Sequence, residues 1–195
     1  SMSEEKEQVD QAFLELENDP DDTYILTNLV DELTTHQAVE YFLDRLRPFS
    51  SDLCLDDGPQ LIKMLLTQWI KNGGDAKPIH FKEMSDWVEA NLDRMEESVV
   101  TYVCLDMVVL FSPNANVFGD QFSDQKMIEY WVGKAMDNAS NTDDWVYIIE
   151  VIAQPNSGSF LADSEWGRKI LELGIKALDK KEAKKLEKKT AGYFS

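Results

Sequence analysis

The chain repeats part of itself at a distance of 42 residues, and no other feature of the sequence restricts its fold as much. The stretch SPNANVF at 112–118 and the stretch QPNSGSF at 154–160 share a Pro-Asn pair, then three residues, then a Phe. Proline does not continue a helix and asparagine tolerates left-handed backbone, so each copy predicts a helix, a Pro-Asn loop and a second helix. The match continues without a gap over further positions, which are Val109-Leu110 with Val151-Ile152, Ile128 with Ile170, and KAMD at 134–137 with KALD at 176–179.

A weaker third copy lies upstream, at a shift of 44 residues. Trp87-Val88 followed by Leu92-Asp93 resembles Trp131-Val132 followed by Met136-Asp137. A spacing of 42–44 residues fits two helices with their loops and is typical of HEAT and armadillo units. We therefore predict one domain over 1–195, with N-terminal helices over 3–80, helical-hairpin repeats over 81–195, and repeat units near 83–120, 124–160 and 163–193.

Apolar residues recur at helical spacing along the rest of the chain, and no alternation predicts a β-strand. We expect an all-α fold of about nine helices, arranged as antiparallel hairpins in a short HEAT/armadillo-like solenoid or as an irregular helical bundle. Asp124 and Ser164 are the predicted N-caps of the second helix in each repeat. Asn72-Gly73-Gly74 is expected to close an earlier helix, and the very apolar helix at 98–111 is expected to be buried on several sides.

The second copy also resembles a helical unit found in bacterial proteins. That unit has a pattern close to ES-I-A-(D/N)-P followed by D-(K)-E-W-A-(R/K), and the resemblance covers about residues 150–178 only. The first copy departs from the pattern, because Asp124 stands where Trp166 would be. The resemblance implies a helical hairpin and implies no activity. The matching residues are Glu150, Ile152, Ala153, Pro155, Asp163, Glu165, Trp166 and Arg168.

The net charge of −18 limits the partners that the chain can have. Residues 1–167 hold 33 acidic and 10 basic side chains, a balance of −23, whereas 168–195 hold 4 acidic and 9 basic ones, a balance of +5. An acidic body repels nucleic acids and anionic membranes, so we expect neither as a partner. The Lys-rich run at 180–189 contains no aromatic residues, and we interpret it as a complement to a helix dipole rather than as a nucleic-acid site.

The sequence contains no set of residues typical of a catalytic or metal site, and we expect no cofactor, no bound metal and no enzyme activity. His36 and Glu40 have the i, i+4 spacing of two metal ligands, but no third ligand is evident, and a solvent-facing histidine is the favoured interpretation. His80 is expected in a loop just before a helix. The Asp-rich runs at 19–22 and 56–57 lack the spacing of a calcium loop.

The cysteines and the first residues indicate a cellular setting. Cys54 and Cys104 show no Cys-x-x-Cys or metal spacing, and we interpret them as buried or half-buried free thiols, with a disulfide or a reactive thiol as the alternatives. This interpretation fits a reducing compartment. The first residues are acidic and polar, unlike a signal peptide. No run reaches the roughly 18 apolar residues that a membrane span needs. We therefore expect a soluble, cytoplasmic protein.

These properties favour a module that binds a basic protein partner. Helical repeats present extended binding surfaces, and a negative surface speeds association with a basic partner. Bacterial immunity proteins, small acidic helical proteins, neutralise basic toxins, and we take immunity or inhibition as the named hypothesis by analogy of class alone. It predicts an exposed acidic strip that contains Asp together with Trp or Tyr. The candidate contact residues are Asp19, Asp21, Asp22, Asp56, Asp57, Glu96, Glu97, Asp143 and Asp144.

Two other functions stay open. A structural adaptor or self-assembling scaffold would expose apolar patches along the repeats and form a homo-oligomer. An enzyme would need a pocket that gathers carboxylates from distant parts of the sequence. The tryptophans bear on this choice, because most are expected in the core and one or two could be exposed as anchors for a partner. They are Trp69, Trp87, Trp131, Trp145 and Trp166.

Overall fold

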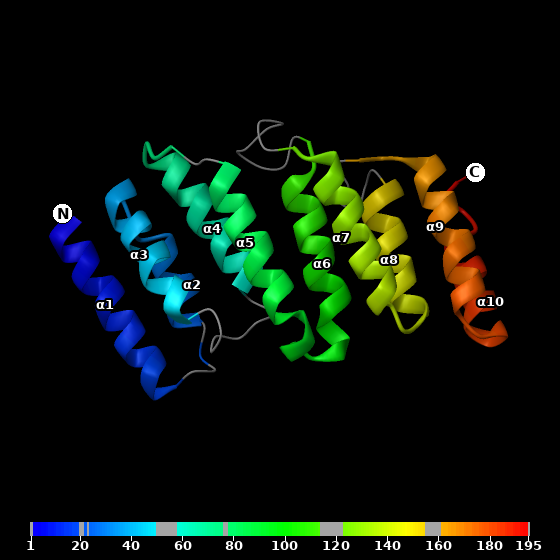
Figure 1. The fold of residues 1–195 in the computed structure, drawn as a ribbon, viewed down its shortest axis with the longest axis horizontal. Coiled ribbons are helices and arrows are strands. Elements are labelled where there is room, and N and C mark those ends of the chain that lie inside the picture. Colours follow the sequence, from blue (N-terminus) through cyan, green and yellow to red (C-terminus); the bar gives the residue numbers. More distant parts are fainter. Residues whose placement is uncertain are drawn as a thin grey trace. The chain divides into compact units, whose positions relative to one another are not determined.

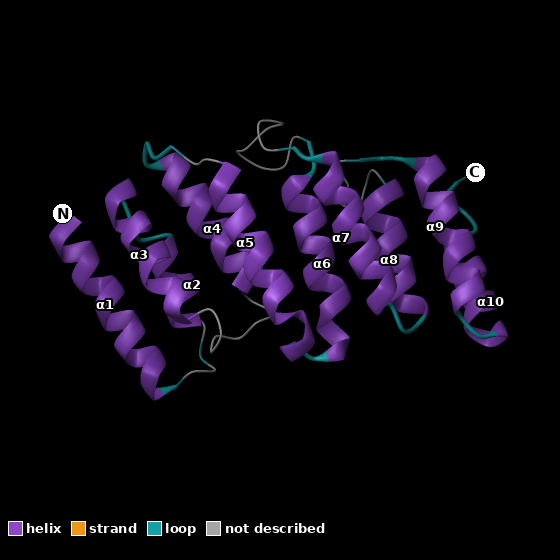
Figure 2. Ribbon diagram, viewed as in Figure 1, coloured by secondary structure: helices purple, strands orange, loops and turns teal. Residues whose placement is uncertain are grey.

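All the secondary structure that the computed structural model describes is helical (Figure 2). The described residues are 2–19, 22, 24–49, 58–75, 78–113, 123–154 and 161–194. Within them lie ten α-helices and one 3-10 helix, so the predicted all-α fold is confirmed with one helix more than expected. The chain divides into two compact units, residues 1–95 and 96–195, which are described separately. The single domain and the solenoid arrangement stay predictions.

The first unit contains α1 (Met2–Asn18), α2 (Tyr24–Val30), α3 (His36–Phe49), α4 (Gly58–Lys71), α5 (Pro78–Asn91) and the 3-10 helix η1 (Leu92–Arg94) (Figure 1). α1 packs on α2 and α3, while α4 packs on α2, α3 and α5. The core follows the apolar spacing of the sequence. Phe13 of α1 meets Phe42 of α3 edge to face, with ring centroids 5.5 Å apart, and both side chains are fully buried.

The end of α4 shows why the sequence needs two successive glycines. Gly73 has a φ of +87°, in the left-handed region that a residue with a side chain rarely adopts. Gly74 lies against the ring of Trp69, and a Cβ on Gly74 would be only 1.8 Å from Cδ1 of that ring. The side-chain amide of Asn72 donates to the Leu33 carbonyl at 2.8 Å, which fastens this end of α4 to the segment after α2.

One sequence expectation about α5, the position of His80 in a loop, is wrong. The helix begins at Pro78, so His80 belongs to its first turn and does not precede it in a loop, because proline is well tolerated at the first helical position. α5 also spans the predicted boundary between 3–80 and 81–195, and it belongs wholly to the first unit.

The second unit contains α6 (Glu97–Phe111), α7 (Gln125–Asn138), α8 (Thr142–Ala153), α9 (Ser164–Ala177) and α10 (Lys180–Thr190). α7 packs mainly on α6, α9 packs mainly on α8, and α10 covers both α8 and α9. α6 is buried over most of its surface, as its composition predicts, and even Thr101 within it is 1% exposed. Its buried residues are Val100, Thr101, Val103, Cys104, Leu105, Met107, Val108, Leu110 and Phe111.

The two helix pairs close with the same corner. Asp124 caps α7 through its side chain and donates its backbone N–H to the carbonyl of Phe111, the last residue of α6, at 3.1 Å. Asp163 caps α9 and donates its N–H to the carbonyl of Ile152, near the end of α8, at 2.9 Å. The predicted cap Asp124 is confirmed. The predicted cap Ser164 is wrong, because Asp163 accepts the hydrogen bond from the Trp166 N–H at 3.0 Å.

The spacing of the two copies is not uniform. α6 ends at Phe111 and α8 ends at Ala153, which agrees with the 42-residue shift. α7 begins at Gln125, whereas α9 begins at Ser164, a shift of 39. The gap-free match is therefore wrong after the first helix, and the second copy has three residues fewer between its helices. The residues inside the two Pro-Asn loops, Phe118 and Phe160 included, lie outside the described parts.

The corrected cap can be tested by two neighbouring alanine substitutions. Asp163→Ala removes the side chain that accepts from the Trp166 N–H, so we expect the free energy of unfolding to fall by about 1 kcal/mol. Ser164→Ala, one position inside α9, should change it by less than about 0.5 kcal/mol. Urea denaturation followed by far-UV circular dichroism measures both values. A larger loss for Ser164→Ala would restore Ser164 as the cap.

A second pair of variants tests the packing of α9. Alanine normally stabilises a helix interior by up to about 1 kcal/mol relative to glycine, and we expect this gain for Gly133→Ala in α7, where nothing lies within 4 Å of an added Cβ. A Cβ on Gly174 would lie 2.8 Å from Leu186 and 2.9 Å from Trp145. We expect Gly174→Ala to destabilise the unit by about 1–2 kcal/mol. Thermal denaturation should shift in opposite directions for the two variants, and equal shifts would contradict this packing.

Candidate protein-binding surface

The described candidate contact residues are divided between the two units. Asp19 is exposed after α1 and Asp22 is half-buried, both in the first unit. Glu96 and Glu97 are exposed at the start of α6 in the second unit. Asp143 is exposed and forms an ion pair with Lys189 of α10, with Oδ1 and Nζ 2.8 Å apart. Three further candidates, Asp21, Asp56 and Asp57, lie outside the described residues.

Asp144 has a structural role that the sequence did not suggest. Its side chain is 7% exposed and accepts hydrogen bonds from the backbone N–H of Ser140 at 2.9 Å and from the hydroxyl of Ser140. Its own N–H donates to the side chain of Asn141, the N-cap of α8. Asp144 thus holds the turn between α7 and α8, and this geometry leaves Asp143 alone to face solvent.

An exposed pair of tyrosines lies where α6 and α8 contact each other. Tyr102 of α6 is 38% exposed and Tyr147 of α8 is 37% exposed. Their ring centroids are 4.8 Å apart and the rings are tilted by 50°. Asp106 follows Tyr102 by one helical turn, and Glu150 follows Tyr147 by three residues, so a carboxylate accompanies each tyrosine on its own helix.

Burial and neighbouring charges both raise the pKa of two tyrosine hydroxyls in this region, those of Tyr147 and Tyr193. Burial raises the pKa of the Tyr147 hydroxyl, and the neighbouring Asp106, Tyr102 and Glu150 raise it further. Tyr193, in the turn after α10, donates its hydroxyl to Oε1 of Glu150 at 2.5 Å. Burial, this hydrogen bond and the charge of Glu150 raise the pKa of Tyr193 to about 12. We call these five residues the tyrosine–carboxylate face.

The tyrosine–carboxylate face combines Asp and Glu with Tyr, and the predicted acidic strip with an Asp and a Tyr or Trp stays a prediction. None of its residues was among the candidate contact residues, because only tertiary structure brings α6 beside α8. One signal was present in the sequence. Each of these helices carries a Tyr with an acidic residue one turn later, in the pairs Tyr102 with Asp106 and Tyr147 with Glu150, in segments that the internal repeat already relates.

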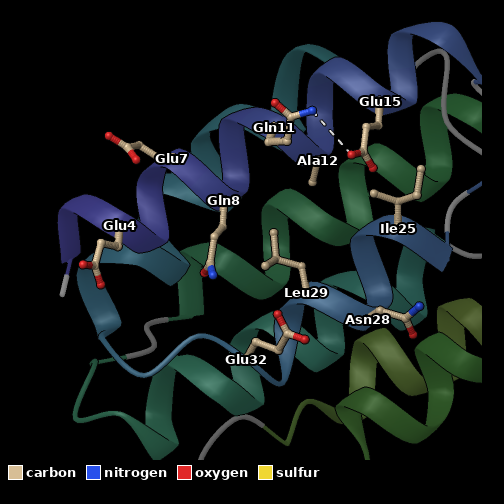
Figure 3. Close-up of a pocket in the computed structure, with 10 residues that line it drawn as sticks. All are labelled: Glu4, Glu7, Gln8, Gln11, Ala12, Glu15, Ile25, Asn28, Leu29 and Glu32. Atoms are coloured by element: carbon tan, nitrogen blue, oxygen red, sulfur yellow. Dashed lines mark hydrogen bonds between the residues drawn. The ribbon is translucent and has the colours of Figure 1, made fainter.

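The tryptophans mostly occupy the core, as expected. Trp131 is fully buried, and Trp69 and Trp145 are 7% and 3% exposed. Trp166 is half-buried and lines a hollow of about 510 Å³ between α7 and α9, beside Glu129 and Met136. The side chain of Trp87 is not described. A second hollow, of about 700 Å³, lies between α1 and α2 in the first unit (Figure 3).

The histidines, cysteines and carboxylates of the described parts of the chain were candidates for a metal site. There, no three His, Cys, Asp or Glu side chains come together so that they could hold a metal ion. His36 is half-buried at the start of α3, and Glu40 is exposed one turn later. Cys104 is fully buried in α6, and Cys54 lies outside the described residues. Among the described helices, none is both long and apolar enough to span a membrane.

Comparison with known proteins adds no relationship. No protein-family model matches the chain, no curated protein matches its sequence, and no solved structure matches its fold.

The raised pKa of Tyr193 predicts a loss of stability at high pH. Because the folded state favours the neutral phenol, the stabilisation is complete below the unfolded pKa of 10.0 and is lost as pH rises toward about 12. Tyr193→Phe removes this proton, so its free energy of unfolding should fall less steeply between pH 10 and 12. Urea unfolding at several pH values measures the slope.

Tyr24→Phe provides the control for this experiment, because Tyr24 is 76% exposed and lies in the first unit. It should retain the slope of the wild-type chain. An equal slope for Tyr193→Phe and the wild type would show that the hydrogen bond to Glu150 does not hold the Tyr193 proton.

Proposed function

We propose that the chain is an acidic protein-binding module that occupies a basic surface of its partner through the tyrosine–carboxylate face. The observation that carries this proposal is the exposed Tyr102–Tyr147 pair beside Asp106 and Glu150. Tyrosine is enriched where binding energy concentrates, because it supplies a large, rigid contact area at low cost in conformational entropy.

The chemistry of this face suits arginine and lysine side chains. A guanidinium group can stack on a tyrosine ring while its N–H groups donate to a nearby carboxylate. Asp106 and Glu150 both raise the pKa of the Tyr147 hydroxyl, so the negative charge of both carboxylates reaches this ring. The two rings, set at 50° to each other, offer surfaces in two directions.

The charge of the rest of the chain favours rapid encounter with a basic protein. The first unit holds 21 acidic and 8 basic side chains, a balance of −13, and the second holds 16 and 11, a balance of −5. Charge of one sign raises association rates with oppositely charged partners, and this effect weakens as salt is added. We therefore propose binding that depends steeply on ionic strength.

Inhibition of a basic protein, as in immunity proteins, is the form of binding that we propose. The scaffold alternative requires a contiguous apolar surface. In the described parts of the chain, the exposed large aliphatic side chains are Met2 and Leu14 of α1 and Leu173 of α9, which are divided between the two units. The sparse use of cysteine, two in 195 residues, supports a cytoplasmic setting for the interaction.

Site-specific photocrosslinking tests the proposal and identifies the partner in one experiment. Benzoylphenylalanine in place of Tyr102 or Tyr147 should crosslink a basic protein in extracts of the source cells. The same group at Lys82, an exposed position of α5 that lines neither described hollow, should not. Mass spectrometry identifies the captured protein. Its affinity for the purified chain should then fall by about tenfold or more in Tyr102→Leu/Tyr147→Leu, as expected when a pair of central aromatic contacts is removed.

Two results would contradict the proposal. One is equal crosslinking from positions 82, 102 and 147, which would indicate non-specific attraction. The other is a captured protein whose affinity does not respond to salt or to the tyrosine substitutions. Asp106→Asn serves as the charge control, because it removes one negative charge from the face and leaves both rings in place.

A further inference from the structure

The hollow between α1 and α2 differs in chemistry from the tyrosine–carboxylate face. Its floor is apolar and consists of Ala12, Ile25 and Leu29, which Figure 3 shows between the two helices. Ala12 and Leu29 are buried and Ile25 is half-buried. The hollow is open to solvent along the helices and has a volume of about 700 Å³, so it is a groove rather than a closed cavity. We call it the α1–α2 groove.

The rim of this groove is negative. Its four charged residues are all glutamates, and the rest of the rim consists of amides, without a lysine or arginine among the residues that line it. Figure 3 shows Glu4 and Glu15 toward opposite ends of the α1 wall and Glu32 beside α2, with Gln11 donating to Glu15 at 3.4 Å. A ligand that fits must therefore combine apolar groups for the floor with positive groups for the rim.

Two other acidic residues of α1, Glu5 and Asp10, hold this helix in place through hydrogen bonds to neighbouring segments. Glu5 is buried and accepts hydrogen bonds from the Thr34 hydroxyl at 2.8 Å and from the Thr35 hydroxyl at 2.7 Å. Although burial opposes it, these bonds lower the pKa of Glu5, so the carboxylate stays charged. Asp10 accepts from Arg45 of α3 at 2.6 Å and also from the Tyr41 hydroxyl. The groove is thus formed before any ligand arrives, which favours binding.

The α1 wall of the groove is long enough for an amphipathic helix of about three turns. Glu4 and Glu15 are 11 residues apart on α1, which corresponds to about 17 Å, or three helical turns. On α2, the lining residues Ile25 and Leu29 are one helical turn apart, and Glu32 lies in the turn just after the helix. An extended peptide gains affinity by pairing with the edge of a sheet, and the two walls here are helices. A helix instead lays its apolar stripe on the floor and places its basic residues at the rim.

We propose that the α1–α2 groove binds a basic amphipathic helix of a partner protein. A second copy of the chain does not fit this description. Its lysine-rich helix α10 packs the apolar residues Ala183 and Leu186 against its own unit, so they cannot reach the floor of another chain's groove. The groove lies in the first unit and the tyrosine–carboxylate face in the second, so this site is independent of the function proposed above.

The probe for the test is a labelled peptide of about fourteen residues, made of leucine and lysine with the leucines at i, i+3, i+4 and i+7. Fluorescence anisotropy measures its affinity for the full chain at low salt. A scrambled peptide of the same composition has the same charge and no apolar stripe. We expect the amphipathic peptide to bind at least about tenfold more tightly than the scrambled one, because only it can cover the floor.

Two matched variants locate the site. Glu7→Gln/Glu15→Gln/Glu32→Gln removes three rim charges, and the affinity for the peptide should fall by about tenfold. Glu17→Gln/Glu40→Gln/Asp93→Asn removes three charges from the same unit outside the groove and should have less than about a threefold effect. Asn28→Trp, which places a ring in the groove, should also abolish the preference for the amphipathic peptide. Thermal denaturation verifies that each variant is folded.

The outcomes separate this site from the tyrosine–carboxylate face. Tyr102→Leu/Tyr147→Leu should bind the peptide as the wild type does, even if those substitutions abolish binding of a captured protein. Equal binding of the scrambled peptide, equal losses in the two triple variants, or NMR shift changes outside α1 and α2 would overturn the proposal of a helix-binding groove.

Discussion

The burial of α6 is the constraint on which the second unit depends. A helix with so few polar residues must be covered on most sides, and α7 and α8 provide that cover. Only a narrow stripe remains toward solvent, and it carries Tyr102 and Asp106. Because the opposite side of the same helix is packed in the core, these two side chains project from a backbone that has little freedom to move. Packing of α6 therefore fixes the position of the Tyr102 and Asp106 backbone within the tyrosine–carboxylate face.

Much of the fold could be predicted because it depends on local chemistry. The apolar spacing identified the helices, Gly73 and Gly74 marked the end of α4, and Asp124 was recognised as a cap. The error in the gap-free repeat alignment has a physical cause. A slip of three residues turns a helix by about 300°, close to a full turn, so the buried face nearly coincides in both alignments. Ile128 and Ile170 are both buried, although the helices themselves are offset by 39 residues.

The candidate site was harder to predict, because it depends on which helices become neighbours. Asp143 and Asp144 are adjacent in the sequence, yet one faces solvent and the other turns inward to Ser140. Composition cannot separate them, since an acidic residue in the first turn of a helix can cap the helix, bind a partner or simply face water. Tyr102 and Tyr147 are separated by two intervening loops, and their contact exists only because α8 returns to the side of α6.

Net charge alone cannot give either proposed surface its selectivity. A chain with 37 acidic side chains attracts cationic proteins in general. This attraction raises the rate of encounter but does not distinguish one basic protein from another. Discrimination must come from groups that are uncharged and correctly placed. On one surface these are the two tyrosine rings, and in the groove they are Ala12, Ile25 and Leu29. The tyrosine pair and the apolar floor of the α1–α2 groove fit basic ligands of different shapes. The acidic residues therefore set the association rate of a partner, and the uncharged residues set which partner is bound stably.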